Sequence, residues 1–286
     1  MSSRVLASRA HEPVLTTVAV FDSGVGGLSV LRALQSEAPH THWVYLADSA
    51  FAPYGDRREP EVIERSHRIT AWLIREYRPD ALVVACNTAT ALAIDTLRNM
   101  YPALHIIGVE PALKTAAQKT RTGCVGVLAT TGTLASERFA TLRRNVEAMG
   151  GPSLQFFCHP CPGLADAIER GDEAQTEHLC RRFLLALCER IPDPKRMDCL
   201  VLGCTHYPFA MDTLQRLCGS GVHLIDNAKQ IARRTVDLVG PSHTPGVAAS
   251  EGGISLCATG SASALIEACE RWLPGTHQPG VRVVQL

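Results

Sequence analysis

Short apolar runs that alternate with helical stretches restrict the folds open to this sequence. The runs VVAC, IIGV, VGVL and LVLG lack the alternation of apolar and polar residues that marks a half-exposed strand. Continuous apolar runs are typical of strands covered on both faces. Strands that alternate with helices form parallel sheets, so the sequence predicts an α/β fold. Ligands of such sheets bind beyond the carboxyl ends of the strands, and we expect the functional residues there.

Two parts of the chain repeat each other. Residues 81–97, ALVVACNTATALAIDTL, align with residues 199–214, CLVLGCTHYPFAMDTL, when one gap is allowed. The aligned identities are Leu82 with Leu200, Val83 with Val201, Cys86 with Cys204, and Asp95-Thr96-Leu97 with Asp212-Thr213-Leu214. The segments TVAVFDSG and CVGVLATTG form an earlier matching pair. We therefore predict two related α/β units, each with one cysteine at the end of a strand, although such units also resemble each other through composition alone.

The repeat suggests where the two domains begin and end. We expect residues 1–112 and 224–286 to form a first domain, which carries Asp22 and Cys86. Residues 113–223 then form a second domain with Cys204 and His206. The strand expected at 223–226 returns the chain to the first domain, and the Gly/Ser/Pro-rich segment 242–253 reads as an exposed loop.

Charge and cysteine content exclude several classes of protein. Lys+Arg and Asp+Glu both number 28, whereas a general nucleic-acid binder carries a basic excess. No run approaches the ~20 apolar residues of a membrane helix, and the N-terminus lacks the apolar core of a secretory signal. An odd count of 11 cysteines then indicates reduced thiols in the cytoplasm. None of the four lysines lies at a strand end, which argues against pyridoxal phosphate.

Cys86 in VVACNT and Cys204 in VLGCTH are the candidate catalytic residues. Each follows an expected strand and precedes a helical stretch, whose dipole stabilises a thiolate. A dipole contribution of at most ~2 kcal/mol lowers a thiol pKa from about 8.5 to about 7, before desolvation raises it again. One such cysteine is most often a packing residue, but two at equivalent places in a repeat favour a function. Two thiols on opposite faces of a cleft can remove a proton from carbon and return one, which inverts a stereocentre without a cofactor.

Polar residues accompany both cysteines. Asp22-Ser23-Gly24 follows the run VAVF, where Asp22 can assist a neighbouring thiol or simply cap a helix. His206 stands two residues after Cys204 and can assist it, or it is an ordinary histidine in a cleft. Asn87-Thr88 and Thr205 add hydrogen-bonding groups at the same strand ends.

Two other motifs allow different functions. Gly24-Val25-Gly26-Gly27, with Asp48 placed for a ribose, is close to a dinucleotide-binding fingerprint and would suit a nucleotide-dependent oxidoreductase. Against it, Ser29 replaces the third glycine and Asp22 would lie near the pyrophosphate. Cys158-His159-Pro160-Cys161 has the spacing of half a zinc site, which Cys199, Cys204 and His206 would have to complete. Packing is the simpler role for that pair.

Several motifs together resemble one family. FDSGVGGLSV, YLADSAFAPYGDR, VVACNTATA, IIGVEPA, VGVLATTGTLAS, CPGLADAIE and LVLGCTHYP resemble the glutamate racemases of the aspartate/glutamate racemase superfamily. The resemblance implies two similar flavodoxin-like domains with parallel sheets, the active site between them, and a cofactor-independent racemase with Cys86 and Cys204 as the catalytic pair. It also implies that the GCTH cysteine takes the α-proton of L-glutamate and the ACNT cysteine that of D-glutamate. Aspartate racemase of the same superfamily is the alternative.

The resemblance assigns further roles residue by residue. Asp22 and His206 assist the thiols. The substrate-binding residues it implies are Asp22, Ser23, Tyr54, Gly55, Asn87, Thr88, Thr130, Thr133, Glu169, Thr205 and His206. The segment before Glu169 is more polar than is usual in the family. D-Glutamate supplies bacterial peptidoglycan, so the resemblance implies a bacterial, cytoplasmic homodimer, and the dozen residues before the first strand match members activated by a peptidoglycan precursor.

Overall fold

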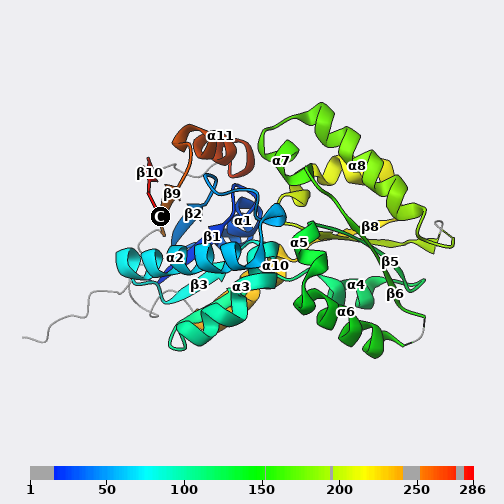
Figure 1. The fold of residues 1–286 in the computed structure, drawn as a ribbon, viewed down its shortest axis with the longest axis horizontal. Helices are drawn as coiled ribbons and strands as arrows, with labels where there is room; N and C mark the ends of the chain where they lie inside the picture. Colours follow the sequence, from blue (N-terminus) through cyan, green and yellow to red (C-terminus); the bar gives the residue numbers. More distant parts are fainter. Residues whose placement is uncertain (1–15, 152, 194–195, 241–251, 275–279) are drawn as a thin grey trace, which may run out of the picture.

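The computed structural model describes residues 16–151, 153–193, 196–240, 252–274 and 280–286. Within these ranges the chain forms two α/β units that lie side by side (Figure 1). The expected loop at 242–253 falls almost entirely outside the described residues, and so does the N-terminal extension. In the described part of the chain, no helix is long and apolar enough to cross a membrane.

The larger unit contains a parallel sheet in the order β10-β9-β2-β1-β3-β4. Its strands are β1 (Thr17–Asp22), β2 (His42–Ala47), β3 (Ala81–Val84), β4 (His105–Gly108), β9 (Ile254–Ala258) and β10 (Val281–Val283). In β1, Val18 and Val20 point to the opposite face from Ala19 and Phe21, and all four are fully buried. The sheet therefore carries helices on both faces.

Two layers of helices cover this sheet. One layer packs against Val18 and Val20 and consists of α1 (Leu28–Glu37), α10 (Ala228–Val239) and α11 (Ala262–Trp272). The other packs against Ala19 and Phe21 and consists of α2 (Glu59–Tyr77) and α3 (Asn87–Met100). A short 3₁₀ turn, η1 (Tyr54–Asp56), leads into α2.

The smaller unit contains a parallel sheet in the order β6-β5-β7-β8. Its strands are β5 (Cys124–Ala129), β6 (Gln155–Pro160), β7 (Cys199–Gly203) and β8 (His223–Ile225). Helices α7 (Leu164–Glu169), α8 (Glu173–Cys188) and α9 (Met211–Cys218) cover one face, and α4 (Leu113–Lys119) and α6 (Glu137–Gly150) cover the other (Figure 1). The remaining elements are α5 (Thr131–Ala135), which leads into α6, and η3 (Tyr207–Ala210), which leads into α9.

The two sheets repeat the same strand order. β2-β1-β3-β4 in the larger unit corresponds to β6-β5-β7-β8 in the smaller one, so β1 matches β5 and β3 matches β7. These are the pairs that the sequence repeat aligned. The predicted fold class, an α/β protein with two similar sets of parallel strands, is confirmed. The order 2-1-3-4 is that of flavodoxin-like sheets, whose ligands bind where the order reverses, between the first and third strands.

The strand expected to return the chain to the first unit lies elsewhere. β8 pairs with β7, so Leu224 and Ile225 belong to the smaller sheet. Both are apolar and complete the edge of that sheet, and the chain crosses back only after them, through Asp226 and Asn227 into α10. The division into two domains otherwise stays a prediction.

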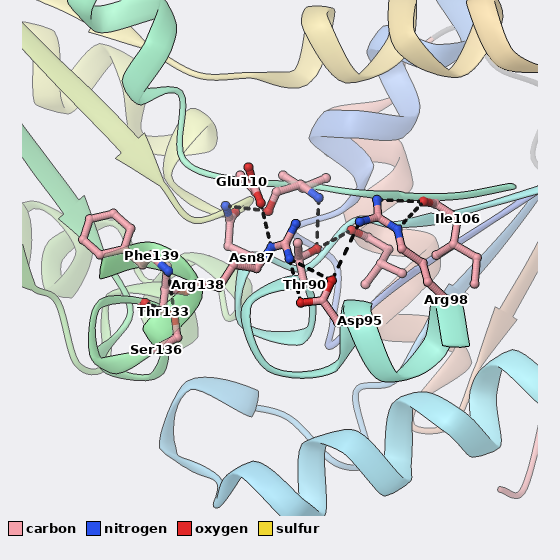
Figure 2. A network of polar contacts seen from close by, with 12 residues as sticks. Asn87, Thr90, Asp95, Arg98, Ile106, Glu110, Thr133, Ser136, Arg138 and Phe139 are labelled. Carbon is pink, nitrogen blue, oxygen red and sulfur yellow. Dashed lines mark hydrogen bonds and ion pairs between the residues drawn. The ribbon is translucent and has the colours of Figure 1, made fainter. Parts of the chain in front are cut away.

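Polar contacts join the two units beside the crossings (Figure 2). The Asn227 side-chain amide donates to the backbone oxygen of Glu110, which ties the returning segment to the outgoing one. Arg138 on α6 pairs with Glu110 at 2.6 Å and with Asp95 on α3 at 2.9 Å. Because Asp95 belongs to the larger unit and Arg138 to the smaller one, this pair spans the interface.

Gly203 ends β7 where the neighbouring strand is very close. A Cβ at this position would lie 2.8 Å from the Ala129 Cβ and 2.9 Å from the Leu128 backbone oxygen. We expect Gly203→Ala to lower the free energy of unfolding by about 1–3 kcal/mol, because a strand backbone must shift. Gly221→Ala is the matched control, since a Cβ there meets nothing within 4 Å. Urea denaturation measures both, and equal stability of the two variants would contradict this packing.

Candidate active site

The carboxyl ends of the central strands of both sheets open into one cavity of about 410 Å³. It lies at the strand-order reversals, where β1 meets β3 and β5 meets β7. The predicted site residues that line it are Ser23, Tyr54, Gly55, Cys86, Asn87, Thr88, Thr130, Glu169, Cys204, Thr205 and His206. The structure thus brings together residues up to 183 positions apart in the sequence.

Cys86 is the N-cap residue of α3. Its sulfur accepts a hydrogen bond from the Ala89 backbone N–H at 3.4 Å, and its thiol donates to the Ser23 hydroxyl at 3.7 Å. Burial and the nearby Asp22 carboxylate raise the pKa of Cys86, although the Ala89 contact lowers it. The helix start therefore lowers this pKa as expected, but the desolvation of Cys86, which is only 5% exposed, outweighs that effect. Cys86 therefore carries its proton at rest.

Asp22 is connected to this thiol by hydrogen bonds through Ser23. Its carboxylate accepts hydrogen bonds from the Ser23 N–H and hydroxyl, at 2.5 and 3.0 Å, and from the Thr205 hydroxyl at 2.9 Å. Asp22 is fully buried and does not line the cavity. Burial raises its pKa despite these contacts. Cys86 Sγ, Ser23 Oγ and Asp22 Oδ1 thus form a continuous line of hydrogen bonds, a link through Ser23 that the sequence did not indicate.

Cys204 has a different partner. Its sulfur lies 3.8 Å from Nδ1 of His206, and Nε2 of the same ring lies 2.6 Å from the Glu169 carboxylate. Burial alone lowers the pKa of His206, but hydrogen bonds to Cys204 and Glu169 more than offset this and raise it well above the usual 6.5. The raised pKa favours the protonated ring, which places a positive charge beside the Cys204 sulfur.

The helix expected directly after Cys204 is absent. In α3 the N–H of Thr90 donates to the Cys86 carbonyl, which is the first bond of an α-helix. The equivalent residue after Cys204 is Pro208, which has no N–H to donate. The chain instead forms the tighter bond from Tyr207 to the Cys204 carbonyl and begins α9 only at Met211. His206, rather than a helix terminus, supplies the positive charge beside this thiol.

The glycine-rich loop after β1 is filled by side chains of the smaller unit. A Cβ at Gly24 would lie 2.2 Å from a Glu169 oxygen, and one at Gly26 would lie 2.3 Å from His206 Nδ1. The hydroxyl of Ser29 lies 2.9 Å from the backbone oxygen of Thr205. These contacts leave no room for a pyrophosphate, so the dinucleotide-binding alternative is wrong. The glycines instead let the acid–base pair of one unit approach the backbone of the other.

The Cys158–Cys161 pair is a packing feature. Cys158 packs with the cluster on the α4 and α6 face of the small sheet, whereas Cys161 is buried in the cluster on the α7 and α8 face. Among the residues that the structure describes, no group of three or more His, Cys, Asp or Glu side chains is arranged to hold a metal ion. The zinc-site alternative therefore has no support in the described part of the chain.

A chain of threonines crosses the cavity wall. The Thr88 and Thr130 hydroxyls lie 2.9 Å apart and join the start of α3 to the end of β5. The Thr130 hydroxyl in turn donates to Thr133 at 2.9 Å. Thr133 is 1% exposed and lies behind Thr130, so its role as a direct substrate contact stays a prediction that the cavity lining does not favour.

Sequence reasoning missed other residues of the cavity wall. Cys161, Asp166 and Arg170 line it, and Asp166 and Arg170 pair with each other along α7. They follow β6, whose carboxyl end opens toward the same space. Their position after a strand, within the motif CPGLADAIE and the residue that follows it, was the available signal.

Comparisons with known proteins identify the class. The profile of the Asp/Glu/hydantoin racemase family matches residues 27–235. The chain therefore belongs to this family, and it is an isomerase.

Individual relatives are more specific. The chain is 46% identical to glutamate racemase of Stutzerimonas stutzeri over 79% of this chain and 83% of that protein. It resembles the crystal structure of a Bacillus anthracis glutamate racemase with a TM-score of 0.81 and 30% identity, covering 95% of this chain and 98% of that one. Escherichia coli glutamate racemase, solved with L-glutamate and the activator UDP-MurNAc-Ala, gives a TM-score of 0.79 at 30% identity, with 96% and 100% covered. The resemblance seen in the motifs is confirmed.

The raised pKa of His206 makes stability depend on pH. Protonated His206 is stabilised only in the folded state, so its contribution is complete below about pH 6.5 and is lost as the pH rises through the raised value. We expect the difference in free energy of unfolding between wild type and His206→Gln to shrink from pH 6 to pH 9 in urea titrations. His178→Gln, on the exposed face of α8, is the control and should follow wild type. A difference that stays constant or grows with pH would contradict the assigned protonation.

Proposed function

We propose that this chain interconverts L- and D-glutamate by a two-base mechanism, with Cys86 and Cys204 as the bases and without a cofactor. The observation that carries the proposal is the pair of thiols, one from each unit, which line a single cavity and have separate acid–base partners. The similarity to glutamate racemases supports glutamate as the substrate rather than aspartate.

The surroundings of the two thiols suit the reaction from L- to D-glutamate. In this direction Cys204, beside the charged ring of His206, acts as the base and takes the α-proton. The Cys86 thiol is protonated and delivers a proton to the opposite face of the same carbon. One C–H bond breaks as another forms, and the enzyme finishes with the proton on Cys204 and the negative charge on Cys86.

The polar partners of the two thiols exchange protons with them, which supports the reaction in the reverse direction. Ser23 and the buried carboxylate of Asp22 can take the proton of Cys86, which makes Cys86 the base toward D-glutamate. His206 gives its Nδ1 proton to Cys204, which makes Cys204 the acid for that direction, and Glu169 continues to hold the ring at Nε2. Because each thiol has its own path, neither direction requires a proton to cross the cavity.

The cavity has the polar groups that an amino acid requires. Hydroxyl and amide groups of Ser23, Asn87, Thr88, Thr130 and Thr205 line it, and these suit carboxylate and ammonium groups. Its volume of about 410 Å³ accommodates one small ligand.

We also place the product in cell-wall synthesis. D-Glutamate is a component of bacterial peptidoglycan, and supplying it is the role implied by the resemblance. The Escherichia coli relative is described with an activator, UDP-MurNAc-Ala, and activation by such a precursor and assembly as a homodimer are proposed here by analogy.

Solvent exchange tests the reaction directly. After exhaustive dialysis and chelation, the protein should racemise L-glutamate in D₂O, and the D-glutamate formed should carry deuterium at the α-carbon because a thiol that exchanges with solvent returns the proton. Circular dichroism and mass spectrometry measure the two events. Racemisation that needs an added metal or pyridoxal phosphate would contradict cofactor independence. Turnover of aspartate with none of glutamate would overturn the substrate assignment.

Single substitutions test which face each thiol serves. Cys86→Ser and Cys204→Ser should each lower net racemisation by roughly 10²-fold or more, because both faces are needed. With glutamate analogues that lose a leaving group after proton abstraction, Cys86→Ser should act on the L-analogue and Cys204→Ser on the D-analogue. Cys188→Ser, outside the cavity, is the control. Near-normal racemisation by either site variant would falsify the two-base mechanism, and reversed preferences would overturn only the facial assignment.

A further inference from the structure

A second polar centre lies directly behind the cavity, at the end of β2. Asp48 follows this strand, is fully buried and does not line the cavity. It is the carboxylate that the dinucleotide-binding alternative placed on a ribose. In the structure its two oxygens accept hydrogen bonds from protein donors, of which the most distant lies 211 positions away in the sequence.

Four hydrogen bonds converge on Asp48. Arg65 on α2 donates from Nε at 2.8 Å and from Nη2 at 2.6 Å, in the two-pronged geometry that is strongest between guanidinium and carboxylate. Thr259, after β9, donates its hydroxyl at 2.6 Å. The Tyr54 hydroxyl donates at 2.6 Å. A third nitrogen of Arg65 donates to the backbone oxygen of Leu286.

These hydrogen bonds determine which atoms of Tyr54 are available to a ligand. Tyr54 is 1% exposed, and burial and the Asp48 charge raise the pKa of its hydroxyl, which therefore stays protonated and donates to Asp48. The phenol is committed to the protein interior. Tyr54 and Gly55 nevertheless line the cavity, and Gly55, which has no side chain, can present only its backbone to a ligand.

The same turn is held from the opposite side by the smaller unit. A Cβ at Gly55 would lie 3.1 Å from the Thr130 Cβ, and one at Gly132 would lie 3.3 Å from the Gly55 backbone oxygen. The turn thus fits between Asp48 and the loop that carries Thr130. A shift of Tyr54 toward or away from Asp48 would move this part of the cavity wall.

We propose that Asp48 and Arg65 are positioning residues for substrate binding, which act through the Tyr54 hydroxyl to fix the backbone of η1 at the cavity wall. The inference rests on the proposed function for its substrate, glutamate. Asp48 and Arg65 touch neither thiol in the described contacts, so they set affinity for the substrate and leave the proton transfers unchanged.

Tyr54→Phe removes the hydroxyl and keeps the ring, which makes it the decisive variant. We expect KM for both enantiomers to rise about tenfold while kcat stays within about twofold, because one hydrogen bond to a buried charge is lost. In a Cys86→Ser/Cys204→Ser background that prevents turnover, calorimetry should show the Kd for D-glutamate rising by the same factor. Tyr77→Phe is the matched control, since that hydroxyl contacts Cys257 away from the cavity and its loss should leave both constants unchanged.

Two further measurements keep the test decisive. Arg65→Lys keeps the charge but loses the two-pronged contact, so its KM should fall between those of wild type and Tyr54→Phe. Amide hydrogen exchange in residues 54–56 should accelerate in Tyr54→Phe, and this measurement requires no substrate. Unchanged KM and unchanged exchange in a folded Tyr54→Phe protein overturn the proposal, and so does a loss of kcat at constant KM. Wild-type protein that leaves glutamate unchanged overturns the proposed function, and the exchange rates still decide whether Asp48 positions the turn.

Discussion

The close approach of the Gly24–Gly27 backbone to Glu169 and His206 is the contact on which the site depends. Gly24 and Gly26 have no side chains, and Glu169 and His206 of the smaller unit occupy the positions that β-carbons would take there. This contact excludes water from His206, brings Thr205 to Asp22 and sets the two thiols around one cavity. Because the surrounding groups are buried, desolvation and hydrogen bonds together set their pKa values.

The repeated strand order gives the two units the same plan, but the two thiols have different surroundings. Cys86 caps a helix and reaches a carboxylate through a serine, whereas Cys204 lies beside a histidine that a carboxylate orients. The difference begins with Pro208, which prevents an α-helix from starting at Cys204. The proposed reaction needs a general acid and a general base together, and this asymmetry gives each thiol its own polar partner.

The sequence predicts the parts of this site that follow strand ends. Apolar runs located β3, β5 and β7, and the repeat singled out Cys86 and Cys204 among the 11 cysteines. Two features of the site could not be predicted from the sequence, for physical reasons. The burial that raises the pKa of Cys86 depends on packing between segments far apart in the chain. The pairing of Asp48 with Arg65 and Thr259 joins three elements whose proximity no local pattern encodes.

The two chain crossings between the units have a mechanical consequence. They run side by side at Glu110 and Asn227, and the hydrogen bond between these residues ties them to each other. Two linked connections tie the units together at this edge of the interface. The Cys86 and Cys204 walls of the cavity belong to different units, so any separation of the units parts these walls together with the Thr88–Thr130 contact. Under the proposed function, the two bases are therefore assembled only when the units are closed on each other.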